Sequence, residues 1–224
     1  MTERDWPGEP PQRRHGCATL LPTGQVFFSG GINFDLSESP DLWGVTNGEL
    51  YTPGIDWAED RYTLADEWTT VPRANVVRNY HSVALLLPDG RVFTAGSNLD
   101  GQAGGRETRE YRIEMYSPPY LDPLAARPQI QSAPSSVTYG ESFSVATTQA
   151  QDIQRVALLR CGSVTHAWDG DQRYVGLEFT VDGADGLSVT APPQGAVAPP
   201  GNYMLWVVNG AGTPCLRAAF VHLS

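Results

Sequence analysis

The chain has 224 residues, a formal net charge of −10 and a pI near 4.7, so it lacks the clustered Lys and Arg of a nucleic-acid-binding surface. No apolar run approaches the roughly 20 residues of a transmembrane helix, and we expect no membrane partner. With 23 Gly, 18 Pro and only 18% charged residues, the composition favours an all-β protein of short strands and tight turns.

The amino-terminal segment, MTERDWPGEPPQRRHG, contains no apolar signal-peptide core, so the chain as written is expected to be cytoplasmic. Cys17, Cys161 and Cys215 are too few and too scattered for a disulfide scaffold, and none belongs to a CxxC pair. One disulfide with one free thiol remains an alternative.

An internal repeat occupies the first half of the chain. HGCATLLPTGQVFFSGG (15–31) recurs as HSVALLLPDGRVFTAGS (81–97) at an offset of 66, and ELYTP (49–53) recurs as EMYSP (114–118) at an offset of 65. Each unit therefore reads as strand, tight turn, strand, long loop, strand.

The turn of the second unit, Leu-Pro-Asp-Gly, combines a fixed φ at Pro88 with a freely positive φ at Gly90, which favours a tight hairpin. Small sheets of this kind are typical of β-propeller blades, which bury their faces against neighbouring blades. Two blades cannot close a ring. We therefore interpret residues 1–122 as an incomplete propeller, covered by an upstream propeller half or by self-association.

A proline-rich crossing over residues 118–128 ends the repeat, and a second domain is predicted for residues 123–224. Short strand candidates with turns between them predict an immunoglobulin-like sandwich. The candidates are SFSVAT, RVALLR, LEFTV, LSVTAP, YMLWVV and RAAFVHL.

The loop within RCGSVTHAWDGDQRYVGLEF (160–179) is unusually polar for a plain sandwich. We interpret it as a projecting loop that carries a functional side chain. It holds His166 and Asp169. Asp171 and Arg173, further along the same loop, are expected to form an ion pair that stiffens it.

Three motifs together, RNYHSVALLLPDGRVF, SVTHAWDGDQR and PPGNYMLWVVNGAGTPC, resemble the carboxy-terminal half of the galactose oxidase and glyoxal oxidase group, the copper-radical oxidases. The resemblance covers essentially the whole chain. It implies two final kelch-type blades followed by an early-set, immunoglobulin-like domain. By this resemblance the chain is similar to proteins that are usually extracellular.

The resemblance further implies one copper ion, held by Tyr80 as axial ligand and by His81 and His166. Asp171 and Arg173 would support these ligands without binding the metal. Imidazole and phenolate suit Cu(II). The family oxidises a primary alcohol or aldehyde, carbohydrates included, with dioxygen and releases hydrogen peroxide. Tyr80 would act as the base for the alcohol proton.

The sequence departs from the family pattern at the radical cofactor. The family's second tyrosine, cross-linked to a cysteine, lies upstream of anything present here, and Cys17 sits in a repeat strand without a fitting tyrosine. The chain alone is therefore expected to be inactive or nearly so, which leaves open whether it is an enzyme. The substrate is not determined, although Phe34 or Trp43 could line its entrance.

Other interpretations stay open at this point. His81 has a repeat counterpart in His15, so a structural histidine that opens each unit is an alternative to a ligand. The whole chain could be a metal-free carbohydrate-binding or assembly module, because a fold does not determine a function. It could also be an excised part of a longer oxidase. Cys161 and Cys215 could form a disulfide if the protein were exported.

Overall fold

A computed structural model describes residues 13–32, 44–59, 61–99 and 108–224. Within them the only helices are short 3₁₀ turns at Pro119–Leu121 and Ala150–Asp152, and strands make up the rest of the regular structure. The all-β expectation is thus confirmed. None of the helices in these ranges is long and apolar enough to cross a membrane.

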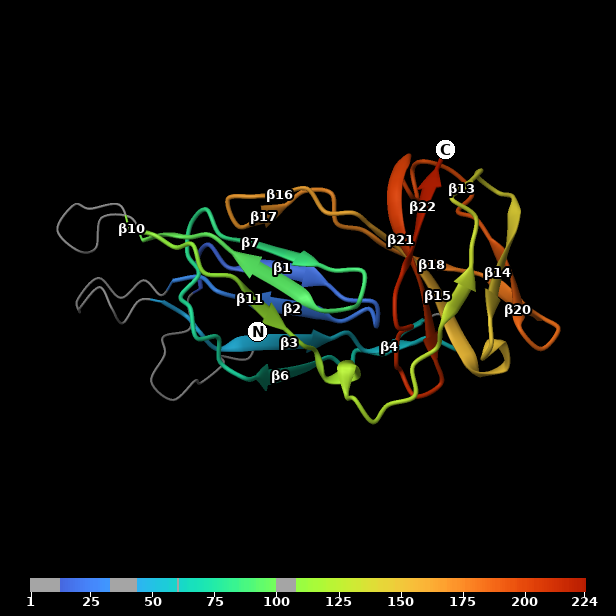
Figure 1. Cartoon of the computed structure of the whole chain (residues 1–224), viewed down its shortest axis with the longest axis horizontal. Coiled ribbons are helices and arrows are strands. Elements are labelled where there is room, and N and C mark those ends of the chain that lie inside the picture. Colours follow the sequence, from blue (N-terminus) through green and yellow to red (C-terminus); the bar gives the residue numbers. More distant parts are fainter. Residues whose placement is uncertain (1–12, 33–43, 60, 100–107) are drawn as a thin grey trace.

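Each repeat unit forms one antiparallel sheet (Figure 1). The first sheet has the order β1-β2-β3-β6, with β1 (Cys17–Leu20), β2 (Val26–Ser29), β3 (Gly48–Thr52) and β6 (Glu67–Val71). The second has the order β11-β8-β7, with β7 (Val83–Leu86), β8 (Val92–Ala95) and β11 (Glu114–Tyr116). The repeat is confirmed at the level of strands, and β6 adds a strand that the repeat did not indicate. That the sheets are kelch-type blades stays a prediction.

Two small ribbons accompany these sheets. They are β4 (Ile55–Asp56) with β5 (Arg61–Tyr62), and β9 (Asn98–Leu99) with β10 (Thr108–Arg109). Each unit also has the predicted tight turn: the amides of Gly24 and Gly90 donate to the carbonyls of Leu21 and Leu87, both at 2.9 Å. Both glycines have φ above +80°, which other residues rarely adopt.

An Arg–Glu pair with one buried partner recurs in both units. Arg13 Nη2 lies 3.1 Å from Glu49, and Arg78 Nη2 lies 3.9 Å from Glu114, at a common offset of 65. Each guanidinium also donates to the backbone carbonyl two residues before its glutamate. Because a buried charge needs both a counter-ion and hydrogen bonds, these pairs hold each unit's first loop against its third strand.

The carboxy-terminal half is a sandwich of two sheets. One has the order β12-β14-β20-β19, with β12 (Ile130–Ser132), β14 (Ser142–Thr147), β20 (Gly186–Thr190) and β19 (Phe179–Asp182). The other has the order β13-β22-β21-β15-β18, with β13 (Ser136–Val137), β22 (Ala219–Leu223), β21 (Gly201–Asn209), β15 (Ile153–Arg160) and β18 (Tyr174–Leu177). All six strand candidates fall on observed strands.

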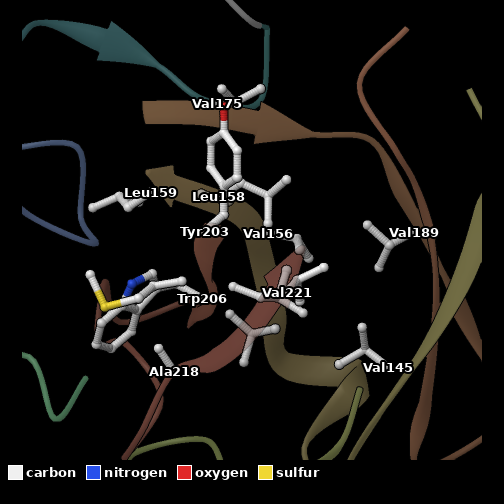
Figure 2. Packing of buried hydrophobic residues seen from close by; sticks show 14 of the residues in the cluster. Val145, Val156, Leu158, Leu159, Val175, Val189, Tyr203, Trp206, Ala218 and Val221 are labelled. Atoms are coloured by element: carbon white, nitrogen blue, oxygen red, sulfur yellow. The ribbon is translucent and has the colours of Figure 1, made fainter. Parts of the chain in front are cut away.

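Strand β21 is buried on both faces, from Tyr203 to Asn209. On one side of β15 and β21 lie Val145 and Val189 of the other sandwich sheet, and on the opposite side lies Trp206 (Figure 2). Leu20 and Leu86 of the repeat sheets pack against this same core. A strand covered on both sides reads as a continuous apolar run, which explains YMLWVV.

The turns of both repeat units dock on the sandwich. Arg155 Nη1 donates to the carbonyl of Thr23 at 2.8 Å, and the amide of Ala218 donates to the carbonyl of Pro88 at 2.8 Å. Arg127 Nη2 donates to the carbonyl of Asp89 at 3.1 Å. The sandwich is therefore fixed to the turn ends of the repeat sheets. The predicted domain boundary at residue 122 stays a prediction.

The conditional alternative of a Cys161–Cys215 disulfide does not occur in this structure, in which all three cysteines are free. Cys161 donates its amide to Asn202, and Cys215 donates its amide to Val207. Five residues of β21 separate these partners, which is about 16 Å of strand. A disulfide needs Cα atoms within roughly 7 Å, so the two thiols cannot meet.

The central sandwich strands are buried on both faces, so shortening one of their side chains should lower the stability of the protein strongly. Leu158 in β15 is fully buried, so we expect Leu158→Ala to lower the free energy of unfolding by about 2–5 kcal/mol, through lost contacts and the cavity left behind. Val181→Ala, at a side chain 39% exposed, should cost about 1 kcal/mol or less. Urea unfolding of both variants measures the difference, and equal costs would contradict the packing.

Three free thiols are expected in protein purified without reductant. Burial raises the pKa of the Cys215 thiol to about 11, and burial also raises the pKa of Cys17 and Cys161. Because the thiolate is the reactive form, a thiol reagent at pH 8 should react slowly with the native protein and with all three cysteines in denaturant. Finding a single thiol in denaturant would show that a disulfide exists after all.

Candidate metal centre

Tyr80 and His81 lie in a short turn directly before β7, and hydrogen bonds to backbone and side-chain oxygens hold this turn. The amide of Asn79 donates to Ser97 Oγ at 2.9 Å, and its side-chain Oδ1 accepts the amide of Tyr80 at 2.6 Å. The amide of Ser82 closes the turn on the Asn79 carbonyl at 3.0 Å. Asn79 and Ser82 are both buried, so the turn is anchored while His81 stays exposed.

His166 lies at the tip of a hairpin formed by β16 (Val164–Thr165) and β17 (Trp168–Asp169). The two tip residues, His166 and Ala167, have φ of 55° and 63°, as in a type I′ turn. Such turns normally use Asn-Gly, because most side chains strain at positive φ. The sequence His-Ala at this tip is therefore not the one that such a turn favours.

The hairpin extends from the sandwich across the two repeat sheets (Figure 1). β16 contacts β7 and β17 contacts β1, so the hairpin bridges the first strands of both units. At its tip the amide of Ala167 donates to the carbonyl of Ser82 at 2.9 Å. This bond joins the turn that carries His166 to the turn that carries His81.

Gln172 fixes the base of the hairpin against β1. Its Nε2 donates to the carbonyl of Ala18 at 2.7 Å, and its Oε1 accepts the amide of Leu20 at 2.8 Å. The side-chain amide thus satisfies the β1 edge as a neighbouring strand would. No sequence pattern pointed to this role for Gln172, because its partners lie about 150 residues away.

The structure brings Tyr80, His81 and His166 together. The ring centres lie 4.0 Å apart for Tyr80 and His81, 4.5 Å for His81 and His166, and 5.4 Å for Tyr80 and His166. Both histidines are exposed, and Tyr80 is half-buried. Two imidazoles and one phenol from separate parts of the chain therefore share one site that is open to solvent.

His15 is a fourth ring at this site. Its centre lies 5.0 Å from that of Tyr80, and its φ of 58° is as strained as those of His81 and His166. Among the described residues, five that are not glycine have positive φ, and four of these are the three histidines and Ala167. The repeat pairs His15 with His81, and that was the one sequence signal for its position. Whether the opening histidine of each unit is structural or a ligand therefore stays open.

The polar groups of the hairpin pair differently from the expectation. Asp171 Oδ1 lies 3.8 Å from Arg160 Nη1, and Arg173 Nη1 donates to the carbonyls of Ala196 and Val197 at 3.3 and 2.6 Å. The predicted ion pair between Asp171 and Arg173 is therefore wrong. Each residue instead ties the hairpin base to a different part of the sandwich.

Asp169 organises the bend after the hairpin. Its Oδ1 accepts the amides of Ser163 at 3.0 Å and Asp171 at 3.1 Å. A carboxylate that accepts two backbone amides fixes the local chain, so Asp169 is a structural residue rather than a ligand.

Cys17 belongs to the core between the two sheets. It is 5% exposed, and its Sγ lies 3.9 Å from Ser82 Oγ. Burial raises the pKa of its thiol, which therefore stays protonated and unreactive. Phe34 and Trp43, the candidate residues for a substrate entrance, lie outside the described residues.

The donor set of the ring cluster fits Cu(II), which accepts imidazole nitrogen and phenolate oxygen. Thr165 Oγ1 lies 2.6 Å from His166 Nδ1, so this nitrogen can donate to the hydroxyl and leave Nε2 free to ligate. In the described ranges, no three His, Cys, Asp or Glu side chains are grouped as metal ligands. A three-ligand set at this site would therefore have to include the phenol of Tyr80.

Residues 127–223 match the family model of the galactose oxidase-like early set domain, which confirms the predicted type of sandwich. Galactose oxidase of Gibberella zeae is 34% identical over 214 residues, which cover 92% of this chain and 29% of that protein. Aldehyde oxidase GLOX of Vitis pseudoreticulata is 36% identical over 211 residues, which cover 87% of this chain and 38% of that protein.

A solved fungal alcohol oxidase in complex with copper matches with a TM-score of 0.77 and 29% identity, over 95% of this chain and 43% of that one. The chain thus spans about a third of the length of its curated relatives and under half of this structure. The chain is homologous to galactose oxidase and glyoxal oxidase, and residues 127–223 belong to the galactose oxidase-like early set domain family.

Proposed function

We propose that this chain is the copper-binding carboxy-terminal portion of a copper-radical oxidase-like protein, with Tyr80, His81 and His166 as the ligands. The observation that carries the proposal is the convergence of these three rings, within 4.0–5.4 Å of one another, at the meeting point of the hairpin and the second sheet. The copper-bound relative supports the choice of metal.

The two repeat sheets would be the last kelch-type blades of a β-propeller in this proposal. Support comes from the repeat itself, from the packing of the two sheets on each other, and from the hairpin that bridges their first strands. First strands of blades line a propeller axis, so the ring cluster would lie on that axis.

The side chains would have distinct roles. His81 and His166 would hold the metal, and Thr165 would orient the His166 ring through Nδ1. The Tyr80 phenolate oxygen would accept the hydroxyl proton of a bound primary alcohol. A bound copper ion would supply one-electron oxidation, and the family pairs it with a cross-linked tyrosyl radical.

Cys17 would not supply that radical partner in this proposal, and its burial between the sheets beside Ser82 supports this. We therefore expect these 224 residues to bind copper without completing a two-electron oxidation. Asp171 and Arg173 would act only by holding the hairpin base to the sandwich.

A metal-free carbohydrate-binding or assembly module is the second candidate. Trp168 favours it, because this side chain is 70% exposed at the hairpin, two residues after His166. An exposed tryptophan beside polar groups is a common feature of recognition surfaces.

Copper titration with variants separates the two candidates. The chain should bind one Cu(II), with nitrogen hyperfine structure in its electron paramagnetic resonance spectrum, and His166→Ala should weaken binding by roughly tenfold or more. His222→Ala is the matched control, because His222 is an exposed histidine on β22 that contacts Asn202 in the sandwich.

Isothermal titration calorimetry measures these affinities alongside the spectra. A wild-type chain that binds no copper, or that binds it equally well after His166→Ala, would remove the ligand assignment and favour the metal-free module. Equal losses in His166→Ala and His222→Ala would indicate non-specific imidazole binding.

Peroxide release tests whether the chain alone can complete the two-electron oxidation. The copper-loaded chain should form no hydrogen peroxide from a primary alcohol or an aldehyde beyond the rate of free Cu(II), because one copper ion accepts only one of the two electrons. A coupled peroxidase assay measures the rate. Turnover above that background, lost in Tyr80→Phe, would show that the chain carries its own second electron acceptor.

A further inference from the structure

Tyr80 contacts three imidazole rings, and one of them lies outside the proposed ligand set. The ring centres of His81 and His166 lie 4.0 and 5.4 Å from that of Tyr80. The third ring is that of His15, whose centre lies 5.0 Å from that of Tyr80, with 59° between the two planes. Among the described residues, the ring contacts of His15 are confined to Tyr80, whereas His81 and His166 also contact each other at 4.5 Å. His15 therefore borders the cluster through the phenol alone.

A backbone bridge positions His15 at the start of the first unit. The amide of Arg14 donates to the carbonyl of Ile32 at 2.9 Å, and the amide of Ile32 donates to the carbonyl of Arg14 at 2.8 Å. This bridge joins the residue before His15 to the segment that follows β2. Two residues after His15, the buried Cys17 begins β1. The backbone of His15 is therefore held on both sides, although its side chain is exposed.

The same segment after β2 also holds the chain that leads to Tyr80. The amide of Gly31 donates to the carbonyl of Arg78 at 2.6 Å, and the buried guanidinium of Arg78 donates in turn to a carbonyl of β8. Gly30 allows this approach, because a Cβ at its position would lie 2.7 Å from the Cβ of Arg78. Adjacent residues of one segment therefore set the distance between His15 and Tyr80.

We propose that His15 is a positioning residue for Tyr80: its ring holds the phenol in place beside the metal and does not itself bind the metal. This inference rests on the proposed copper site. His81 and His166 would each use a ring nitrogen for the metal, so their orientation would follow the metal. The orientation of His15 would not, so this ring can hold the phenol in one place in the metal-free and in the copper-loaded chain.

The side chain of Tyr80 needs such a neighbour. A hydrogen bond from its amide to Asn79 fixes the backbone of Tyr80, but it leaves the side-chain torsions free. Aromatic rings favour tilted contacts at centre distances of about 4.5–7 Å, and the contact with His15 falls in this range. A ligand that is ordered before the metal arrives loses less conformational freedom on binding. His15 therefore raises copper affinity by ordering the phenol in advance.

The repeat places a histidine here without the tyrosine that precedes its counterpart. His15 corresponds to His81 at an offset of 66, but Arg14 stands where the second unit has Tyr80. The first unit thus lacks a Tyr-His pair of its own at this position. It contributes a neighbouring ring, whereas the second unit contributes two ligands.

Two variants separate the ring of His15 from its nitrogen atoms. His15→Asn removes the ring and supplies a residue that tolerates the φ of 58° at this position. His15→Phe keeps a ring and has no nitrogen ligand, and His15→Trp replaces it if it does not fold, because indole is only a donor. His222→Ala, at an exposed histidine of the sandwich, is the control. Circular dichroism confirms that each variant folds.

Nuclear magnetic resonance on the metal-free chain tests the contact. Nuclear Overhauser cross-peaks should join the rings of His15 and Tyr80, with the Tyr80 signals identified through Tyr80→Phe. The Tyr80 ring shifts should move toward those of free tyrosine in His15→Asn and stay away from them in His15→Phe. Missing cross-peaks, or unchanged Tyr80 shifts in His15→Asn, overturn the proposal whatever the chain does with copper.

Copper-loaded samples test the role. The wild type should show a visible absorption band from the Tyr80 phenolate to Cu(II), which Tyr80→Phe abolishes. His15→Asn should weaken copper binding about tenfold and reduce this band, as loss of a supporting residue does. His15→Phe and His222→Ala should retain both.

Pulsed electron paramagnetic resonance on the same samples identifies the ligands. It should detect two coupled imidazoles in the wild type and in both His15 variants. A third imidazole that both variants lose, or equal loss of copper affinity in His15→Phe and His15→Asn, would make His15 a ligand and overturn the positioning role. A chain with the ring contact but without the phenolate band would leave His15 as the residue that orders Tyr80 and would overturn the copper site instead.

Discussion

The backbone hydrogen bond from Ala167 to Ser82 is the contact on which the ring cluster depends. It joins the turn of His166, built on the sandwich, to the turn of His81, built on the second sheet. The ring contacts of His166 with Tyr80 and His81 accompany this hydrogen bond and join the same two turns. A metal site made from both halves of a chain needs such a fixed contact, because ligand positions must hold within fractions of an ångström.

The sandwich provides the rigid base for this contact. β15 and β21 are buried on both faces, since the second sandwich sheet covers one side and the repeat units cover the other. The hairpin leaves directly after β15, and Gln172 and Asp171 hold its base to β1 and to Arg160. His166 is thus positioned by a packed core, although it lies on an exposed loop.

Backbone strain distinguishes the candidate centre from the remaining loops. Three histidines adopt φ near 60°, a conformation that costs free energy for any side chain and that glycine would relieve. The sequence HA at the hairpin tip has no advantage over NG as a turn. Of the five described non-glycine residues with positive φ, three are thus the histidines around Tyr80.

The sequence alone determined the strands, the repeat and the sandwich, because these follow from local patterns: alternating apolar residues, Leu-Pro-x-Gly turns and a fixed offset of 65 to 66 residues. Tyr80, His81 and His166 could be named from motifs, whereas their convergence could not. Only the tertiary structure decided that His15 joins them, that Asp171 pairs with Arg160, and that Cys161 and Cys215 lie apart. His15, Tyr80 and His166 are far apart in the chain, and their geometry depends on how the sandwich docks on the turns, which no local pattern encodes.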